Sequence, residues 1–599
     1  MLRQLFPRAS ARTALRLSQL PTQRLATWQA ARQYSVKPVA ASDAKPLGLD
    51  ASKLTIEETK TPGKLSKPEE LVFGRKFSDH MLTIEWTKEK GWLAPQIIPY
   101  QNLSLDPATC VFHYAFEKLL VLLSFPHGIP PSTSTVTLEQ FLSCQLSHSA
   151  FSLSFLRPSF YFQSLSSTSH QALQIFSHSP TATMLRQLFP RASARTALRL
   201  SQLPTQRLAT WQAARQYSVK PVAASDAKPL GLDASKLTIE ETKTPGKLSK
   251  PEELVFGRKF SDHMLTIEWT KEKGWLAPQI IPYQNLSLDP ATCVFHYAFE
   301  CFEGMKAYKD KAGKIRLFRP DKNMARLNKS SARIALPTFE PTAMIELISK
   351  VVRTDERFIP SERGYSLYLR PTMIGTQKTL GVNAPGSALL YVIASPVGPY
   401  YPTGFKAITL EATDYAVRAW PGGVGDKKLG ANYAPCIVPQ QEAESRGHQQ
   451  NLWLFGQEEF VTEVGSMNMF VALKNKETGQ NELVTAPLDG TILEGVTRDS
   501  VLSLAREKLA PEGWLVSERK YTMKELDEAA QEGRLIEAFG SGTAAIISPV
   551  RSIAWKGKTV SCGLSEAEES GEVALRMKGW IEARQYGDEE HEWSHVVEV

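Results

Sequence analysis

A perfect internal repeat is the strongest constraint on what this 599-residue chain can fold into. Residues 1–117 and 184–300 are identical at all 117 positions, at an offset of 183. Repeats that each form a structural unit diverge in sequence, so identity over this length indicates a recent or artificial duplication. Because both copies would need the same partners in one core, we expect only the second copy, which runs on into the rest of the chain, to complete a domain.

The segment between the two copies, residues 118–183, differs in character from both. It contains three charged residues, Lys118, Glu139 and Arg157, and is rich in Ser, Leu and Phe. It has no sustained period of 2 or 3.6 residues that would indicate a strand or a helix. We interpret it as non-coding sequence included in the reading frame; a genuine linker is the alternative. Residues 36–117, a partial domain, are expected not to fold.

Each copy begins with a segment of targeting character. Residues 1–35 hold six arginines and no acidic residue, and Arg8, Arg12 and Arg16 are spaced to line one helical face. An arginine-rich, acid-free, amphipathic start is typical of mitochondrial presequences. We therefore predict presequences at 1–35 and 184–218, cleavage near the end of the second, and a mitochondrial matrix location. An ordinary basic helix is the alternative.

The distribution of charge argues against a nucleic-acid partner. The net charge of +8 arises from +6 in residues 1–183 and +6 in residues 184–218, which leaves residues 219–599 at −4. The sequence contains no run of 18 apolar residues, the length that would indicate a membrane span. The six cysteines form no CxxC pair, and no His/Cys spacing indicates a metal site.

The remaining sequence has an α+β pattern, in which strand-rich halves are separated by grouped helices. We predict a small N-terminal domain at 219–397, a Pro/Gly-rich interdomain linker at 398–408 and a large cofactor-binding domain at 409–599. Strands are predicted at 263–275, 365–375, 387–396, 451–456, 459–465, 468–474 and 482–487, and helices at 339–355, 498–508 and after a capping box of Thr522 and Glu525.

Several weak signals point to a phosphorylated ligand. Gly495–Thr497 precede a predicted helix and Gly540–Ala544 form a glycine-rich turn, and both arrangements present backbone amides to an anion. Arg319 or Arg326 could grip a phosphate. Each signal also has an ordinary structural explanation. Together with the glycine-flanked lysine pair in "GGVGDKKLGANYAP" they describe a lysine that forms a Schiff base with pyridoxal phosphate, although they do not choose between the two lysines.

The motifs "FHYAFECFEGMKAY", "RLFRPDKNMARL", "LYLRPTMIGT", "GGVGDKKLGANYAP", "TEVGSMNMF", "LDGTILEGVTRDS" and "FGSGTA" occur in this order between about residue 247 and the C-terminus. In them the chain resembles the branched-chain amino acid aminotransferases, of the fold type IV pyridoxal phosphate class. The resemblance implies a two-domain α+β fold with the cofactor at the domain interface. It also implies a homodimer and reversible amino transfer between L-leucine, L-isoleucine or L-valine and 2-oxoglutarate.

The same resemblance assigns the cofactor site. Lys428 would be the catalytic lysine, with Lys427 its solvated neighbour, and Arg319 would be structural. Glu463 would pair with the pyridine nitrogen and Tyr433 would contact the phenolic oxygen. The phosphate would be bound by Arg326, Val496, Thr497 and Thr543.

It also assigns the substrate site. Ser466 and the Ala544 amide would hold the substrate carboxylate, and Arg370 the γ-carboxylate of glutamate. The side-chain pocket would be walled by Phe256, Tyr297, Phe302, Tyr368 and Tyr400. Some animal members carry a redox CxxC motif where this chain has Ala545 and Ser548, so thiol switching is not expected.

Three alternative functions are weighed against this one. D-amino acid aminotransferase and aminodeoxychorismate lyase share the lysine and the glutamate, but not "FEGMKAY" or "GGVGDKKLGANYAP" in this form. A scaffold with a degenerate enzyme domain would explain the repeat, but the intact set of Lys428, Glu463 and Arg326 argues against it. The sequence leaves the physiological direction and the order of preference among the three substrates open.

Overall fold

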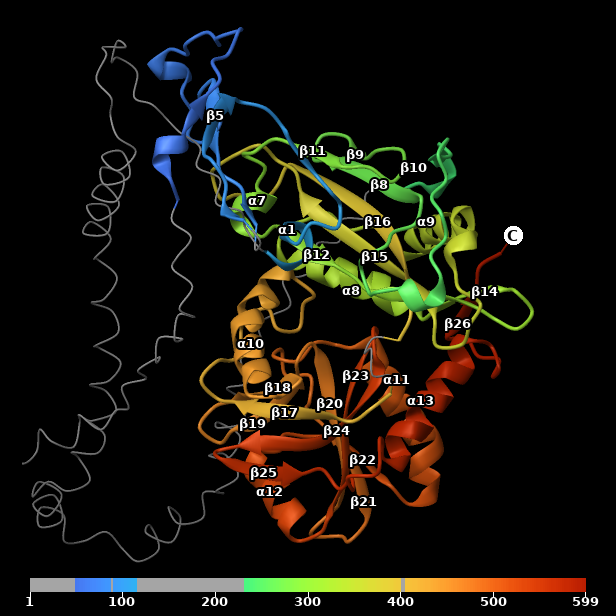
Figure 1. Ribbon diagram of the computed structural model, residues 1–599. Coiled ribbons are helices and arrows are strands. Elements are labelled where there is room, and N and C mark those ends of the chain that lie inside the picture. Colours follow the sequence, from blue (N-terminus) through green and yellow to red (C-terminus); the bar gives the residue numbers. More distant parts are fainter. Residues whose placement is uncertain (1–48, 88–89, 116–230, 400–404, 599) are drawn as a thin grey trace, which may run out of the picture. The chain divides into compact units, whose positions relative to one another are not determined.

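The computed structural model of the chain describes residues 49–87, 90–115, 231–399 and 405–598 (Figure 1). Both predicted presequences and the segment 118–183 lie outside these ranges. Contacts divide the described residues into a small unit, 49–57 with 82–97, and a large unit, 58–81 with 98–598. In the small unit, Thr55 and Ile56 pair in parallel with Gln96 and Ile97, and β3 (Trp86–Thr87) pairs with β4 (Gly91–Trp92).

The large unit contains two extended sheets, of which the first has ten strands and is mainly antiparallel. Its order is β26-β14-β13-β15-β16-β8-β10-β7, with β12 beside β15 and β9 beside β8. The C-terminal strand β26 pairs with β14, so the end of the predicted 409–599 domain adds a strand to the sheet of the preceding domain. The strands are β7 (Thr238–Ile239), β8 (His263–Thr270), β9 (Gly274–Trp275), β10 (Gln279–Pro282), β12 (Glu300–Phe302), β13 (Met305–Lys309), β14 (Ile315–Phe318), β15 (Ser366–Gly375), β16 (Ser387–Val397) and β26 (Ser594–Val596).

Strand β16 is apolar on both faces, because each face of this sheet packs against other residues. One face lies on α8 (Pro320–Arg333) and α9 (Pro341–Thr354), and α9 presents an apolar stripe to it at helical spacing. The other face forms a second core with α7 (Val294–Tyr297) and β11 (Leu286–Leu288). The first face of β16 contributes Leu390, Val392 and Ala394, and the second Leu389, Tyr391 and Ile393.

The second sheet closes into a barrel. Strand β19 pairs with both β18 and β20, which completes the ring β17-β18-β19-β20-β23-β24, and β21, β22 and β25 extend it. The strands are β17 (Ile408–Thr413), β18 (Gln450–Phe455), β19 (Phe460–Val464), β20 (Met467–Lys474), β21 (Asn481–Thr485), β22 (Leu515–Glu518), β23 (Leu535–Gly542), β24 (Ile546–Trp555) and β25 (Lys558–Ser561). The helices of this part are α10 (Ile437–Ser445), α11 (Val496–Leu504), α12 (Met523–Gln531) and α13 (Glu572–Gln585).

The predicted elements are confirmed with differences at their ends, except the single strand predicted at 263–275. That segment forms two antiparallel strands, β8 and β9, because the chain turns between Thr270 and Gly274. Helix α11 begins at Val496 rather than 498, and the chain continues from it as a π-helix over Ala505–Leu509. Thr522 caps α12 by accepting a hydrogen bond from the Glu525 amide at 3.1 Å. The second half of the predicted capping box is replaced, because the Glu525 carboxylate binds Arg519 instead.

Part of the first copy has regular structure, which differs from the expectation that residues 36–117 do not fold. Within the large unit, β6 (Leu103–Leu105) pairs with β11, and α1 (Val111–Tyr114) lies beside β12 (Figure 1). Val111 and Phe112 are buried in the core on the outer face of the first sheet. The physical reason is that this face has room for a second layer, which the second copy covers only in part.

Among the described residues, no helix is both long enough and apolar enough to span a membrane.

Candidate active site

Lys428 lies in a loop, and both its amide and its carbonyl form hydrogen bonds with the rest of the fold. Its amide donates to Ser330 Oγ at 2.9 Å, and its carbonyl accepts from the Phe302 amide at 3.2 Å. Gly425 allows the loop to lie close to its neighbours, because a Cβ there would be 2.4 Å from the Ala419 Cβ and 2.6 Å from the Thr491 carbonyl oxygen. The lysine is therefore positioned by the first sheet and its helix, although it belongs to the second domain.

The side chain of Lys428 is directed into a ring of aromatic groups. Its Nζ donates to the Tyr433 hydroxyl at 3.1 Å and is 4.9 Å from the centroid of Phe302. Burial, and then the Arg326 guanidinium, lower the pKa of Lys428 to about 8, so a much larger share of this amine is neutral near pH 7 than for an ordinary lysine. Lys427 is not the solvated neighbour expected, since its side chain is only 14% exposed and pairs with Asp426.

Glu463, at the end of β19, is a buried carboxylate with one oxygen satisfied and one open. Its Oε1 accepts from Asn468 Nδ2 at 3.0 Å and from the Leu493 amide at 3.2 Å. Its Oε2 lies 3.2 Å from Arg418 Nε but has no hydrogen-bond partner among the described residues. Burial raises the pKa of the Glu463 carboxyl, and Arg418 opposes this effect. A buried carboxylate oxygen without a hydrogen-bond partner suits a ligand that brings an N–H donor.

The start of α11 offers an anion site beside Arg326. Gly495 precedes the helix and no side chain caps it, so the first amides remain for a ligand. A Cβ on Gly495 would be 2.1 Å from Asn468 Oδ1, which explains the glycine. Arg326 is held by Glu303, which accepts from Nε and Nη2 at 2.7 Å each, and Nη1 donates to the Glu494 carbonyl at 2.9 Å. Two of the five N–H groups of the guanidinium remain for a phosphate.

The glycine-rich turn that joins β23 to β24 carries Thr543 and Ala544, both half-buried. A buried lysine supports this turn, because Lys306 Nζ donates to the Ala544 carbonyl at 2.8 Å. Burial lowers the pKa of Lys306 to about 8. Ser466, which is exposed, lies in the tight turn between β19 and β20.

The predicted side-chain pocket is assembled from β12, β15 and the loop before β8. The ring of Phe302 lies 5.1 Å from that of Tyr433, and the ring of Phe256 lies 4.8 Å from that of Tyr368. Arg370 Cζ stands 4.8 Å over the Phe302 ring, and Nη2 donates to the Tyr368 hydroxyl at 3.4 Å. Among the described residues Arg370 forms no ion pair, and its Nε is buried without a partner. An unpaired buried guanidinium suits a ligand carboxylate.

Tyr297 does not lie with these residues, contrary to the prediction. Its hydroxyl donates to the Leu380 carbonyl, and its ring lies against that of Phe299. The identical residue of the first copy, Tyr114, takes the predicted place: its hydroxyl accepts from Arg370 Nη1 at 3.3 Å, and its ring is 5.5 Å from that of Phe302. Tyr400, also predicted for the pocket, lies outside the described residues.

Sequence reasoning missed three residues that hold the site together. Glu303 binds Arg326, Arg418 faces Glu463, and Asn468 joins Glu463 to the loop before α11, since its Nδ2 also donates to the Leu493 carbonyl at 2.9 Å. Glu303 and Asn468 lie inside motifs quoted above, where every polar residue of the motif could have been considered. Arg418 carried no such signal. Arg319, expected to be structural, binds Asp499 and Ser500 of α11.

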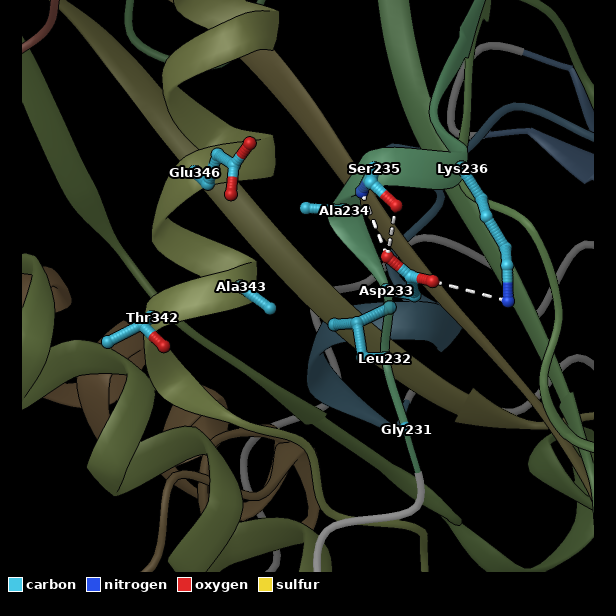
Figure 2. A pocket seen from close by; sticks show the side chains of 9 residues that line it. All are labelled: Gly231, Leu232, Asp233, Ala234, Ser235, Lys236, Thr342, Ala343 and Glu346. Atoms are coloured by element: carbon cyan, nitrogen blue, oxygen red, sulfur yellow. Dashed lines mark hydrogen bonds and ion pairs between the residues drawn. The ribbon is translucent and has the colours of Figure 1, made fainter.

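A separate groove lies between the segment Gly231–Lys236 and α9 (Figure 2). Asp233 accepts from the Ser235 amide and hydroxyl and pairs with Lys236 at 3.2 Å, so these charges already neutralise one another. The groove contains none of the predicted site residues. No group of three or more His, Cys, Asp or Glu side chains in the described part of the chain is arranged to hold a metal ion.

These groups fit pyridoxal phosphate. The open Oε2 of Glu463 matches a protonated pyridine nitrogen, the uncapped start of α11 with Arg326 matches a phosphate, and Lys428 offers an amine of lowered pKa to an aldehyde. Residues from both sheets contribute, which places the site at the domain interface, as predicted.

The amino-transferase class IV family matches residues 300–553. The cytosolic and mitochondrial branched-chain-amino-acid aminotransferases of Saccharomyces cerevisiae are each 60% identical over 367 residues, which is 61% of this chain and 98% and 93% of theirs. The mitochondrial enzyme of Bos taurus is 46% identical over 365 residues, 60% of this chain and 91% of its own. This chain belongs to the branched-chain-amino-acid aminotransferase family. The crystal structure of the Escherichia coli branched-chain amino acid aminotransferase is 24% identical over 55% of this chain and 99% of that chain, with a TM-score of 0.44.

The cofactor of this family is pyridoxal 5′-phosphate, and the chain is an α+β fold type IV aminotransferase. Family membership also decides between the alternatives raised by the sequence. The alternatives were a D-amino acid aminotransferase, an aminodeoxychorismate lyase and a scaffold with a degenerate enzyme domain. They are set aside, because the relatives are branched-chain-amino-acid aminotransferases at 45–60% identity.

The two adjacent lysines permit a matched test of the site. Lys428→Ala is expected to abolish covalent cofactor binding and amino transfer, because the only amine beside Tyr433 and Phe302 in the described site is lost. Lys427→Ala removes the same charge one residue away and is expected to retain most of the activity. For both variants, covalent cofactor binding is measured by the absorbance and the mass of the purified protein after borohydride reduction. Amino transfer is measured as turnover. Equal loss in both variants would contradict the choice of Lys428.

Proposed function

We propose that this chain catalyses reversible amino transfer between L-leucine, L-isoleucine or L-valine and 2-oxoglutarate. The proposal rests on three groups of one site: a lysine of lowered pKa, a buried and half-satisfied carboxylate, and an arginine without an ion pair among aromatic rings. The names of relatives with up to 60% identity support the substrate class. The two half-reactions alternate at one site, because amino acid and oxo acid use the same pocket.

Lys428 would hold the cofactor through Nζ, and its amine would carry the proton during amino transfer. When bound, pyridoxal phosphate supplies a ring that takes up the electron pair left by the departing α-proton of the amino acid. The lowered pKa of Lys428 favours the neutral amine that can accept this proton. Tyr433, 3.1 Å from Nζ, orients the amine and contacts the phenolic oxygen of the ring.

Glu463 and the anion site fix the two ends of the cofactor. The Glu463 carboxylate would pair with the pyridine nitrogen; Arg418 opposes the rise in the pKa of Glu463 that burial causes, and Asn468 holds the carboxylate in place. Arg326 and the backbone amides of Val496, Thr497 and Thr543 bind the phosphate. Glu303 positions Arg326 by a two-point contact, which fixes the plane of the guanidinium.

The substrate lies between the turn at Ala544 and the aromatic wall. Ser466 and the Ala544 amide hold the α-carboxylate that all substrates share. Arg370 binds the second carboxylate of glutamate and 2-oxoglutarate, whereas a branched aliphatic side chain packs against the aromatic rings around it. These rings are Phe256, Phe302 and Tyr368, together with Tyr114, whose hydroxyl binds Arg370 Nη1. Tyr400, which lies outside the described residues, stays a predicted member of this wall.

Glu463→Gln is expected to leave cofactor binding largely intact, because the phosphate ligands are unchanged. Turnover should fall by about two orders of magnitude, as when one preorganised electrostatic contact is lost, roughly 3 kcal/mol. The matched control is Glu411→Gln, which removes a charge from a strand carboxylate that binds Arg446 at 2.6 Å. Cofactor content by absorbance, melting temperature and turnover are measured for both. Near-parental turnover of Glu463→Gln would refute the role.

Arg370→Met tests the substrate assignment. The KM values for glutamate and 2-oxoglutarate should rise by roughly tenfold or more, the range for losing a hydrogen bond to a charged group. The KM for leucine should change far less, because Met keeps an apolar side chain over Phe302. Arg363→Met, which removes an arginine that pairs with Asp588 at the surface, is the control. Equal changes for leucine and 2-oxoglutarate would contradict the role of Arg370.

The proposed assembly is a homodimer of residues 219–599, which we call the enzyme body. The pairing of β6 with β11 supports it, because these two strands have the same sequence and meet about a local two-fold axis. The partner molecule of such a dimer would present the same surface that residues 98–115 present within this chain. Tyr297 of the partner molecule would then stand beside Arg370, which explains why Tyr297 is turned away from the site of its own chain.

The proposed location is the mitochondrial matrix. Relatives from both the cytosol and the mitochondrion are similar to this chain, so the proposal rests on the arginine-rich, acid-free segment 184–218.

Residues Met184–Val599, expressed alone, are expected to be soluble, dimeric and active. The reason is that 367 aligned residues account for 98% of a whole yeast relative. The measurements are turnover with leucine and 2-oxoglutarate and mass by light scattering, with the 599-residue chain beside it. In mitochondria the same form should be trimmed near Ser218, as read by N-terminal sequencing. An inactive short form beside an active long chain would show that residues 1–183 are a required part of the enzyme.

A further inference from the structure

Residues 98–115 of the first copy cover the outer face of the first sheet as an identical partner would. In the ladder of β6 with β11, Leu105 lies opposite Leu286, Ser104 opposite Ser287 and Leu103 opposite Leu288. Ser104 and Ser287 are the same residue of the two copies, so the ladder is centred on a residue and its own duplicate. A two-fold interface between identical surfaces has this pattern.

The side chains around the ladder repeat each contact in both directions. The Tyr100 hydroxyl donates to Asp289 Oδ1 at 2.6 Å, and the equivalent Tyr283 hydroxyl donates to Asp106 Oδ1 at 2.7 Å. The amides of the two equivalent asparagines, Asn102 and Asn285, likewise donate to Ser287 and Ser104, each at 3.2 Å. These four polar contacts therefore form two reciprocal pairs.

The covering segment is buried as a subunit interface would be. Phe112 is 0% exposed and its ring lies 5.9 Å from that of its own duplicate, Phe295. The Tyr391 hydroxyl of β16 donates to the Pro107 carbonyl at 2.9 Å. His113 is buried and lies 3.2 Å from the Thr372 hydroxyl of β15. The face of the sheet that carries Tyr391 is thus closed by residues from outside the enzyme body.

The same segment completes the active site. Helix α1 places the Tyr114 hydroxyl 3.3 Å from Arg370 Nη1 and its ring 6.0 Å from that of Tyr433. In the second copy, α7 has the same sequence, but Tyr297 reaches the Leu380 carbonyl instead. The tyrosine that binds Arg370 Nη1 is therefore supplied by a copy of the segment, whereas Tyr368 of β15 binds Nη2.

We propose that, in the 599-residue chain, residues 98–115 act as a built-in substitute for the second subunit. They occupy the dimer surface from within the chain and supply Tyr114 to the site, so the long chain is a complete monomer and the short form a dimer. The inference rests on the proposed function for the meaning of the site. A contact within one chain does not depend on protein concentration, whereas a second copy must bind from solution, which favours the segment at low concentration.

The mass of the full chain in solution is the first test. At low micromolar concentration the full chain should have the monomer mass of 66.7 kDa by light scattering, and Met184–Val599 should have twice its own monomer mass. Phe112→Arg places a charge in the buried contact and should release the segment, so that the full chain becomes a dimer. Phe112→Ala should shift the mass in the same direction to a smaller extent.

The matched control is Phe73→Arg, which makes the same change in the first copy at a side chain that is 83% exposed, and the mass should stay that of a monomer. A dimeric full chain, or a Phe112→Arg chain that remains monomeric, would overturn the proposal. These masses do not depend on catalysis. Inactivity of every form would refute the proposed function and leave the result on the segment standing.

Tyr114→Phe supplies a kinetic readout that links the segment to the site. In the full chain the KM for 2-oxoglutarate should rise by about tenfold or more, the effect of losing one hydrogen bond to a charged group. Tyr297→Phe in the dimeric short form should raise the same KM by a similar factor, since the partner then supplies that hydroxyl. An unchanged KM for 2-oxoglutarate in the Tyr114→Phe full chain would overturn the assignment of Tyr114 to the site.

Discussion

The active site depends on the way the Lys428 peptide backbone is held between two domains. The amide binds Ser330 of α8 and the carbonyl binds the Phe302 amide of β12, while the next residue, Leu429, bridges to Cys301. These backbone contacts fix the point from which the lysine side chain starts, and the hydrogen bond from Nζ to the Tyr433 hydroxyl places its other end. An amine held at both ends of its side chain in this way stands at a defined distance from a bound reactant.

Two buried ion pairs flank this lysine and have different tasks. Arg326 binds both carboxylate oxygens of Glu303, and this two-point contact presents the remaining N–H groups of the guanidinium in a fixed plane. Arg418 with Glu463 leaves one atom on each side, Nη1 and Oε2, without a hydrogen bond among the described residues. A buried pair gains little net stability from its charges, and an unsatisfied one costs more. We infer that the second pair is kept for the ligand that it receives rather than for the fold.

The sequence predicted most elements for reasons that are local, and the resemblance to a family predicted the residues of the candidate site. Helix α9 and strands β15 and β16 followed from apolar periodicity, and α12 from its capping residue. Lys428, Glu463 and Arg326 followed from motifs. The position of Tyr297 did not follow, because which of two identical helices supplies the tyrosine is decided by tertiary contact. The supporting roles of Glu303, Arg418 and Asn468 also depend on residues far away in the sequence, so their local sequence gave no sign of them.

The duplication separates what the local sequence determines from what its partners determine. Helices α1 and α7 occupy equivalent residues in the two copies, so their turn is encoded locally. Strand β8 behaves differently. It runs unbroken over His263–Thr270, whereas the same sequence in the first copy gives only His80–Thr83 and Trp86–Thr87. Only β8 has β16 beside it along most of its length, and Trp269 is 8% exposed where its duplicate Trp86 is 54% exposed. The length of this strand therefore depends on a neighbouring strand with which it can pair. The chain has only one such neighbour, β16, among the described residues, so only one of the two identical segments forms the long strand.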